Sequence, residues 1–384
     1  MGTTSTTATT ARPRPRLDRR VSDAVRDLAQ RSAAALSAGP RVASPPDWNA
    51  RPYRVLLLRT GAMGDTVLLT SLARAIALSH ATIEVDALVR APYASLLNGV
   101  PYVRQVIPFD CTDRRRNPGP ELMVHLRRQR YDVVIDGWMT FEGLARTGFP
   151  TASIMFVLAT GARYRIGQAG LRNSYIMNLP VSLDRTLPMV ERAGAMATPF
   201  GVDVSTTDWR PALVVSAEER AGAEARWARV APSGERPFRL LVNVTATDAA
   251  RRWRDDRMID VIRRTRASRP GLTALVTGLP SEEARIRQIA EAAGAGASTQ
   301  PMRDAVALCA ACDALVSPDT GMTHVATAFS RPMVVLMQRD NWMWGPYKVP
   351  ARVLTAADRA SLDSISADAV SDAVDSLLGE IGAI

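Results

Sequence analysis

The sequence predicts an α/β protein built from two doubly wound parallel sheets. The chain has 384 residues, which favours two domains at roughly 150 residues per domain. From Tyr53 onward, short continuous runs of Val, Ile and Leu alternate with helical segments; this alternation is typical of parallel sheets covered by helices on both faces. The alternation restarts at residue 239. Two such sheets would bind ligands at the carboxyl ends of their strands, in a central cleft between the domains.

The composition is that of a soluble globular protein with a large positive charge. Hydrophobic residues make up 47% of the chain and charged residues 22%, which excludes a wholly disordered, collagen-like or disulfide-stapled chain. The net charge of +10 favours an anionic partner. The 47 arginines against one lysine, Lys348, indicate a GC-rich genome rather than selection for binding. Nucleic acid is not an expected partner, because basic and aromatic residues do not interleave and no helix-turn-helix pattern occurs.

The cysteines and the apolar runs predict a cytoplasmic protein. Cys111, Cys309 and Cys312 are too few for a disulfide framework, which favours a reducing compartment. Cys309 and Cys312 form a C-x-x-C in an Ala-rich helical stretch without further ligands at metal spacing, so we expect packing and no metal site. No apolar run is long enough to span a membrane, and no secretory signal is recognisable.

Four segments are predicted along the chain. Residues 1–50 carry eight Arg, four Asp and no Glu, and are expected to form a basic, flexible extension with a short helix in VSDAVRDLAQRSAAAL. This extension is interpreted as a solvated tail, with contact to a membrane surface or an acidic partner as the alternative. Residues 51–205 and 206–355 are predicted to form the two domains, and residues 356–384 a C-terminal helix.

The apolar pattern also predicts the individual elements. The first domain is expected to hold a helix over 66–80 and strands at 55–59, 84–89, 103–109 and 132–138. The second is expected to hold strands at 239–244, 274–278, 314–319 and 333–338. Residues 181–235, rich in Arg, Ala and Pro, are predicted to be a partly helical connection.

The first candidate site is the turn RTGAMGDTVLL between a strand and a helix. Gly61 and Gly64 allow a sharp turn and a close approach to a ligand. Asp65 would lie at the helix start, either as an N-cap or as a carboxylate that takes a proton from a bound hydroxyl. Asp86 follows at the distance of a ribose-binding acid, so a dinucleotide site stays open as a minor alternative.

The second candidate site is SPDTGMTHVATAF, again at a strand end that leads into a helix. Asp319 and Thr320 offer oxygen ligands, and Gly321 leaves its amide unobstructed. The helix that follows would direct its N-terminal dipole and free N–H groups at an anion. His324 would bind substrate or phosphate, or serve as a structural histidine.

Two further loops carry charges that suit a nucleotide. Arg251 and Arg252 follow a strand, where paired guanidinium groups suit a pyrophosphate, although exposed loop arginines are common. Glu282 or Glu283 would accept hydrogen bonds from ribose hydroxyls, or serve as a carboxylate at a helix start.

Aromatic residues gather in the loop RDNWMWGPYK. Trp342, Trp344 and Tyr347 would form a wall of a ligand site or anchor the loop.

Taken together, these motifs resemble glycosyltransferase family nine, the family of the ADP-heptose:lipopolysaccharide heptosyltransferases. The motifs are GAMGD, a strand followed by an R-x-W loop, DTGMTH and a WGPY loop, in this order and spacing. The pieces NGVPYVRQVIPF, YDVVID and GARYRIG also resemble family segments. The resemblance covers the chain from Arg54 to the C-terminal helix and leaves out the first fifty residues.

The resemblance implies a GT-B fold of two Rossmann-like domains and an inverting glycosyltransferase that needs neither a metal nor a cofactor. The implied donor is a nucleotide sugar, ADP-heptose first of all. The implied acceptor is an anionic, lipid-linked or polysaccharide substrate of the cell envelope, such as the lipopolysaccharide inner core. Peripheral contact with the cytoplasmic face of the inner membrane would follow.

The resemblance also assigns roles to residues. Asp65 matches the catalytic base, Asp319 matches a residue that holds the sugar hydroxyls, and Glu282 or Glu283 matches the ribose-binding acid. The diphosphate site falls on Thr320, Gly321 and the helix start at Met322, with His324 as the histidine of the motif and Arg251 where the family usually has Lys. The acceptor-side candidates are Arg59, Gly61, Gly64, Arg90 and Arg163.

Alternatives remain open at the level of sequence. The same fold would also suit transfer to a protein hydroxyl or another surface glycan. A nucleotide-binding Rossmann-like protein without transferase activity, or a nicotinamide-dependent enzyme that uses GAMGD, is the alternative from a different class.

Overall fold

The computed structural model describes residues 44–110, 119–136, 150–169, 176–231 and 237–382. All of them belong to one compact unit, Val42–Ile384. Most of the predicted N-terminal extension, with its short helix, and Cys111 lie outside the described residues. Within these ranges, no helix has the length and apolar character needed to cross a membrane.

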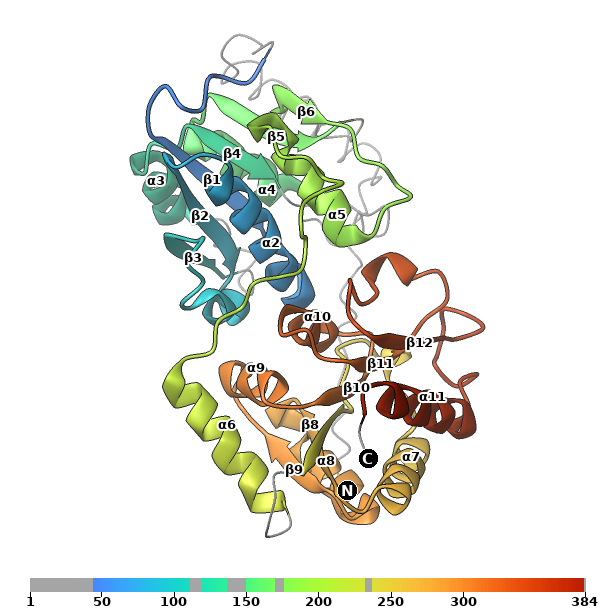
Figure 1. Ribbon diagram of the computed structural model, residues 1–384. Helices are drawn as coiled ribbons and strands as arrows, with labels where there is room; N and C mark the ends of the chain where they lie inside the picture. Colours follow the sequence, from blue (N-terminus) through green and yellow to red (C-terminus); the bar gives the residue numbers. More distant parts are fainter. Residues whose placement is uncertain (1–43, 111–118, 137–149, 170–175, 232–236, 383–384) are drawn as a thin grey trace, which may run out of the picture. The chain divides into compact units, whose positions relative to one another are not determined.

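The first sheet has six parallel strands in the order β3-β2-β1-β4-β5-β6 (Figure 1). Its strands are β1 (Tyr53–Arg59), β2 (Ile83–Arg90), β3 (Gln105–Phe109), β4 (Val133–Asp136), β5 (Tyr164–Gln168) and β6 (Leu179–Val181). Its helices are α2 (Met63–Ser79), η1 (Ala91–Leu97), α3 (Pro120–Arg128), α4 (Pro150–Thr160), α5 (Met189–Gly194) and η4 (Ala195–Phe200).

The second sheet also has six parallel strands, in the order β12-β11-β10-β7-β8-β9. Its strands are β7 (Phe238–Asn243), β8 (Leu272–Gly278), β9 (Gly296–Thr299), β10 (Ala314–Pro318), β11 (Met333–Met337) and β12 (Ala351–Thr355). Its helices are α6 (Ala217–Val230), η5 (Ala249–Arg251), α7 (Asp255–Ser268), η6 (Pro280–Glu282), α8 (Glu283–Ala293), α9 (Met302–Ala310), α10 (Gly321–Ala328), η7 (Trp342–Trp344) and α11 (Ala367–Glu380).

Both sheets therefore have the same topology, and the predicted fold class is confirmed. Each one reverses its strand order once, between β1 and β4 in the first sheet and between β7 and β10 in the second. In doubly wound sheets, ligands bind at the carboxyl ends of the strands beside this reversal. The topology thus directs attention to the loops that leave β1 and β10, which carry the two strongest sequence motifs.

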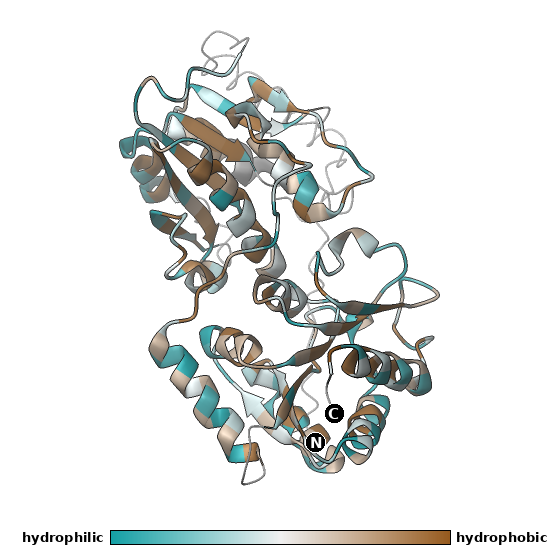
Figure 2. Ribbon diagram, in the orientation of Figure 1, coloured by the Kyte–Doolittle hydropathy of each residue, from teal (hydrophilic) through white to brown (hydrophobic). Residues whose placement is uncertain are grey.

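Alternating side chains bury both faces of the second sheet. On β7, Leu240 and Val242 join one hydrophobic cluster with α7, α8 and α11, whereas Leu241 joins another with α6, α9 and α10. This division follows from the two-residue period of a strand. Figure 2 shows most strands in brown, while α6 and α11 alternate between teal and brown, as expected for helices with one buried face.

The sequence pattern missed four short strands: the edge strands β6, β9 and β12, and β5, which lies between β4 and β6. They carry Gly, Pro or charged residues, as in YRIGQ, LPV, GAST and ARVLT, so they lack the continuous apolar run of a central strand. The connection predicted from residue 181 also holds α5 and η4, whose Met189, Val190 and Phe200 are buried in the first core.

Trp48 lies in the segment expected to be a flexible extension, yet it is 4% exposed and part of the first hydrophobic core. Its ring stacks on Phe200 with centroids 4.4 Å apart, and its indole N–H donates to the carbonyl of Pro199 (2.8 Å). The folded unit therefore begins before residue 51, because the buried Trp48 ring is part of the first hydrophobic core.

A third hydrophobic cluster, which we call the shared cluster, joins side chains of the two halves. It contains Val67 of α2 and Leu96 of η1 together with Met322 and Val325 of α10. The free cysteines Cys309 and Cys312 are buried in the same cluster; burial raises the pKa of the Cys312 thiol, as expected for cysteines that serve packing. The shared cluster holds the starts of α2 and α10 against each other.

Candidate active site

The first part of the site is the start of α2, directly after β1. The helix begins at Met63, so Asp65 lies inside its first turn and not at the N-cap. Its Oδ2 accepts the backbone N–H of Ala62 (2.7 Å), and its Oδ1 accepts a hydrogen bond from the guanidinium of Arg59 (2.5 Å), whose side chain is 6% exposed. Because a carboxylate oxygen has two lone pairs, each oxygen of Asp65 retains one that can accept a proton.

The two glycines of this turn are required by close contacts. A Cβ at Gly61 would lie 2.2 Å from Oδ2 of Asp65, and a Cβ at Gly64 would lie 2.6 Å from Cδ2 of His324. Both distances are shorter than non-bonded atoms tolerate. Gly61 therefore leaves room for the carboxylate, and Gly64 leaves room for the imidazole.

The second part of the site is the carboxyl end of β10 and the start of α10. Thr320 is the N-cap, and its hydroxyl accepts the N–H of Met322 (3.3 Å) and the side-chain amide N–H of Asn243 at the end of β7 (3.2 Å). Asp319 is 4% exposed and accepts a hydrogen bond from the side-chain amide of Asn341. Since the first N–H groups of a helix have no partner within it, the start of α10 is suited to hold an anion.

The two helix starts pack directly against each other. Gly64 of α2 faces His324 of α10, and a Cβ at Gly321 would lie 2.7 Å from Cγ of Met63. Glycine on both sides lets the two backbones approach. As a result, the buried His324 lies within electrostatic reach of both Asp65 and Asp319, which the sequence places on separate sheets.

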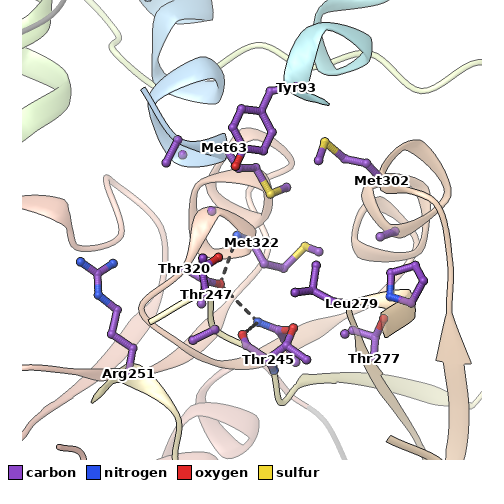
Figure 3. A pocket seen from close by; sticks show the side chains of 18 of the residues that line it. Met63, Tyr93, Thr245, Thr247, Arg251, Thr277, Leu279, Met302, Thr320 and Met322 are labelled. Atoms are coloured by element: carbon purple, nitrogen blue, oxygen red, sulfur yellow. Dashed lines mark hydrogen bonds between the residues drawn. The ribbon is translucent and has the colours of Figure 1, made fainter. Parts of the chain in front are cut away.

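A cavity of about 530 Å³ opens beside the two helix starts, a volume typical of small-molecule sites. Figure 3 shows Arg251 on one side of this cavity and Met302 with Leu279 on the other. The side of Arg251, which we call the polar side, also includes Thr247 and Thr320 (Figure 3). The side of Leu279 and Met302, which we call the apolar side, also includes the hydroxyl of Thr277 (Figure 3).

Arg251, a candidate donor-binding residue, lines the cavity. Its Nη1 lies 3.6 Å from Oδ2 of Asp319, and its Nε is buried without a hydrogen-bond partner in the described part of the chain. The side chain as a whole is 39% exposed, so it is the terminal nitrogens of the guanidinium that can donate to a bound anion.

The structure distinguishes the two candidate ribose acids. The Glu282 side chain is 13% exposed; its Oε1 lies 3.0 Å from Arg252 and 3.4 Å from Arg285, and its Oε2 lacks a hydrogen-bond partner among the described residues. The Glu283 side chain is 49% exposed and pairs with Arg287 along α8. Glu282 is thus the more buried of the two carboxylates, although neither is among the described residues that line the cavity.

Burial shifts the protonation of two site residues in ways that favour neutral forms. It lowers the pKa of His324, although the charges of Asp319 and Asp65 oppose this shift. It also raises the pKa of Asp319, with Arg251 and His324 acting in the opposite direction. Within the described ranges, no three His, Cys, Asp or Glu side chains gather as the ligands of a metal ion would.

The structure does not bring Arg163 to the site, which corrects its expected acceptor-side position. Val55, Val133 and Tyr164 are level across β1, β4 and β5. Arg163 comes just before that level and Arg59 four residues after it, a separation of about five residues, or roughly 16 Å along the strands. Arg163 therefore lies at the amino end of its strand, and ligands bind at the other end.

Arg90, another acceptor-side candidate, ends its strand, β2. Its guanidinium lies 5.4 Å from the ring centroid of Tyr93, which lines the cavity.

Asp86 does not support the dinucleotide alternative. It lies in the middle of β2 and is fully buried, where it accepts hydrogen bonds from Tyr131 (2.7 Å) and Arg104 (2.5 Å). A ribose-binding acid would lie at the carboxyl end of this strand. Asp86 therefore links strands within the first half.

The aromatic loop mainly anchors the chain. Tyr347 is buried and donates to Oε1 of Glu191 in α5 (2.7 Å), and the rings of Trp344 and His324 have centroids 6.2 Å apart. Trp342 is 54% exposed. The loop also supplies Asn341 to Asp319.

Sequence reasoning missed Asn243, Asn341 and Tyr93 as site residues. Asn243 had a signal, since it is a polar residue that ends the buried run RLLVN. Asn341 lies in a loop and Tyr93 in the short helix η1. Their contacts depend on the packing of distant elements, so the local pattern contained no comparable signal.

Comparison with known proteins agrees with this geometry. Residues 121–369 match the family model described as "Glycosyltransferase family 9 (heptosyltransferase)". Over 306 residues, the chain is 26% identical to lipopolysaccharide heptosyltransferase 2 of Salmonella typhimurium, covering 74% of this chain and 82% of that protein. The enzyme of the same name from Escherichia coli is 25% identical over 301 residues, with the same coverage.

The fold is shared with solved structures of this kind. A glycosyl transferase family 9 structure from Veillonella parvula superposes with a TM-score of 0.74 at 17% identity, covering 87% of this chain and all of that one. The E. coli ADP-heptose lps heptosyltransferase II has a TM-score of 0.65 at 24% identity, covering 86% of this chain and 99% of that one. The chain has the GT-B fold and belongs to glycosyltransferase family 9.

Substitution of Gly64 tests the contact between the helix starts. We expect Gly64→Ala to lower the free energy of unfolding by about 1–3 kcal/mol, because the added Cβ displaces the buried His324 ring. Gly379→Ala in α11 is the matched control, since nothing lies within 4 Å of its added Cβ, and it should be neutral or stabilising by up to ~1 kcal/mol. Urea unfolding measures the free energy of unfolding of both variants. An equal change in Gly64→Ala and Gly379→Ala would contradict the contact between Gly64 and His324.

The lowered pKa of His324 predicts a pH dependence of stability. The unfolded chain protonates this histidine near its ordinary pKa of about 6.5, whereas the native state resists protonation to lower pH. The unfolded state therefore binds more protons just below that pH, so stability falls as the pH falls. Urea unfolding at pH 7.5 and 5.5 should show a larger loss for wild type than for His324→Gln. A loss of the same size in both proteins would mean that another group is responsible.

Proposed function

We propose that the protein transfers a sugar from a nucleoside diphosphate to an acceptor hydroxyl, with inversion at the anomeric carbon and without a metal ion. The observation that carries this proposal is the juxtaposition of a proton acceptor and an anion site. Asp65 lies at the start of α2, the anion site lies at the start of α10, and the two helix starts touch.

The polar side of the cavity is proposed to bind the donor. The diphosphate would lie at the start of α10, where the Thr320 and Gly321 region offers backbone N–H groups and the helix dipole. Arg251 would add a forked cation, where the family resemblance leads us to expect Lys. These groups stabilise the negative charge that develops on the leaving diphosphate. Asp319 would accept hydrogen bonds from hydroxyls of the sugar.

Asp65 is proposed to act as the base. It takes the proton of the acceptor hydroxyl while the acceptor oxygen forms a bond to the anomeric carbon. The bond from that carbon to the diphosphate oxygen breaks, and the nucleoside diphosphate leaves with its electron pair. Arg59 and the Ala62 N–H hold the carboxylate in one orientation, so its free lone pairs are preorganised for this proton transfer.

The relatives support ADP-heptose as the donor and a lipopolysaccharide precursor as the acceptor, since two of them are named lipopolysaccharide heptosyltransferase 2 and one ADP-heptose lps heptosyltransferase II. A net charge of +10 suits an anionic, lipid-linked acceptor at the cytoplasmic face of the inner membrane. Transfer to a protein or to another surface glycan uses the same donor site, and an acceptor screen distinguishes these outcomes.

Conversion of Asp65 to its amide tests the proposed role of this residue as the catalytic base. Asp65→Asn should lower turnover with ADP-heptose by about 10²- to 10⁴-fold, while donor affinity stays within about threefold because the amide cannot accept a proton but fills the same space. Product formation by mass spectrometry and donor titration by calorimetry measure the two quantities, and the anomeric configuration of the product tests inversion.

Asp132→Asn is the matched control for this experiment. Asp132 also accepts from an arginine, Arg51 (2.5 Å), and from a backbone N–H, that of Arg54 (3.0 Å), but at the amino end of the same sheet. Its turnover should remain that of wild type. Near-normal turnover in Asp65→Asn would refute the assignment of Asp65 as the catalytic base. If the wild type binds ADP but transfers no sugar to any acceptor, the transferase activity itself is refuted.

The neighbouring glutamates provide a second matched pair. Glu282→Gln should raise the KM for the donor by about 3- to 30-fold, because a ribose hydroxyl loses a charged acceptor, with a smaller effect on kcat. Glu283→Gln should leave both constants unchanged, since this side chain pairs with Arg287 on the surface of α8. Steady-state kinetics over a range of donor concentrations measures both variants; the reverse pattern would assign the ribose to Glu283.

A further inference from the structure

Among the described residues that line the cavity, one is aromatic, Tyr93, and it comes from the first half of the chain. Tyr93 lies in η1, directly after β2, whereas Leu279 and Met302 on the apolar side belong to the second half. Figure 3 shows the Tyr93 ring at the upper edge of the cavity, near Met63 and opposite Met302. Tyr93, Met63 and Met302 all pack against the shared cluster.

The Tyr93 ring is held in place from several sides. Leu96 and Leu97 anchor η1 through their burial, and the guanidinium of Arg90 lies 5.4 Å from the ring centroid, within the range of a cation–π contact. The Nε of Arg90 is buried without a hydrogen-bond partner in the described ranges. The ring is therefore positioned before any ligand arrives.

The chemistry of the apolar side suits a flat aromatic ligand. Leu279, Pro280 and Met302 provide apolar surface without charge, and methionine sulfur packs favourably against aromatic rings. A nucleobase is the part of a nucleoside diphosphate that requires such surroundings, because its faces are apolar while its phosphates are charged. With the diphosphate on the polar side, at Arg251 and the start of α10, the nucleobase would lie on the side of Tyr93 and Met302.

We propose that Tyr93 contacts the nucleobase of the donor, so that the first half of the chain supplies part of the donor site. This inference rests on the proposed function for the placement of the diphosphate. It makes donor affinity depend on a residue outside the second sheet and its helices. It also gives the packing of η1 against α9 a role in binding, because that packing sets the separation of Tyr93 and Met302.

The test compares two ligands, a nucleoside diphosphate and inorganic pyrophosphate, by titration calorimetry. The nucleotide is whichever of ADP, GDP, UDP and CDP the wild type binds most tightly. Tyr93→Ala should weaken nucleotide binding by about 5- to 100-fold, as expected for loss of one aromatic contact to a base, and should leave pyrophosphate binding within about twofold. Tyr93→Phe keeps the ring and should bind the nucleotide within about threefold of wild type.

Tyr102→Ala is the matched control, since Tyr102 packs against the first core and does not line the cavity; it should bind both ligands as wild type does. Wild-type nucleotide affinity in Tyr93→Ala overturns the inference, and so does an equal loss for nucleotide and pyrophosphate. If only the proposed function is wrong, the result differs. The wild type then transfers no sugar, yet Tyr93→Ala still weakens nucleotide binding and leaves pyrophosphate binding unchanged. A wild type that binds none of the four nucleotides overturns both.

Discussion

The close contact between the starts of α2 and α10 is the constraint on which the site depends. Gly64 and Gly321 have no side chains, so the imidazole of His324 and the side chain of Met63 occupy the space where Cβ atoms would lie. The shared cluster supports this contact with apolar packing on the same two helices. The carboxylate of Asp65 and the proposed anion site of α10 are therefore held by rigid elements, as a reaction between two bound substrates requires.

The electrostatics of the site follow from this packing. Helix starts carry partial positive charge, and here two of them meet beside a cavity that also holds Arg251. The nearby acids are each held by donors: Asp65 by Arg59 and the backbone, Asp319 by Asn341. Burial keeps His324 in its neutral form by lowering its pKa, so the ring adds no repulsion toward a neighbouring guanidinium. The result is a site suited to an anionic ligand beside the carboxylate of Asp65.

Local sequence predicted the parts of this arrangement whose chemistry is contained in a short motif. GAMGD and DTGMTH each place a glycine and an acid after a buried strand, and both were placed correctly at strand ends. Arg163 was placed wrongly, because a motif does not reveal which end of its strand faces the ligand. Trp48 was assigned to a mobile segment because its neighbours are polar, although its own ring is buried against Phe200.

The sequence by itself determined the two parallel sheets, the strand-to-helix turns and the residue types at each turn, because these depend on local periodicity and on glycine. Only the tertiary structure decided which turns meet. It set Gly64 against His324, joined Asn243 to Thr320, buried Glu282 and left Glu283 exposed, and brought Tyr93 to a cavity lined mainly by the other half. These are contacts between residues distant in the chain, and they form only when the hydrophobic surfaces of both halves pack together.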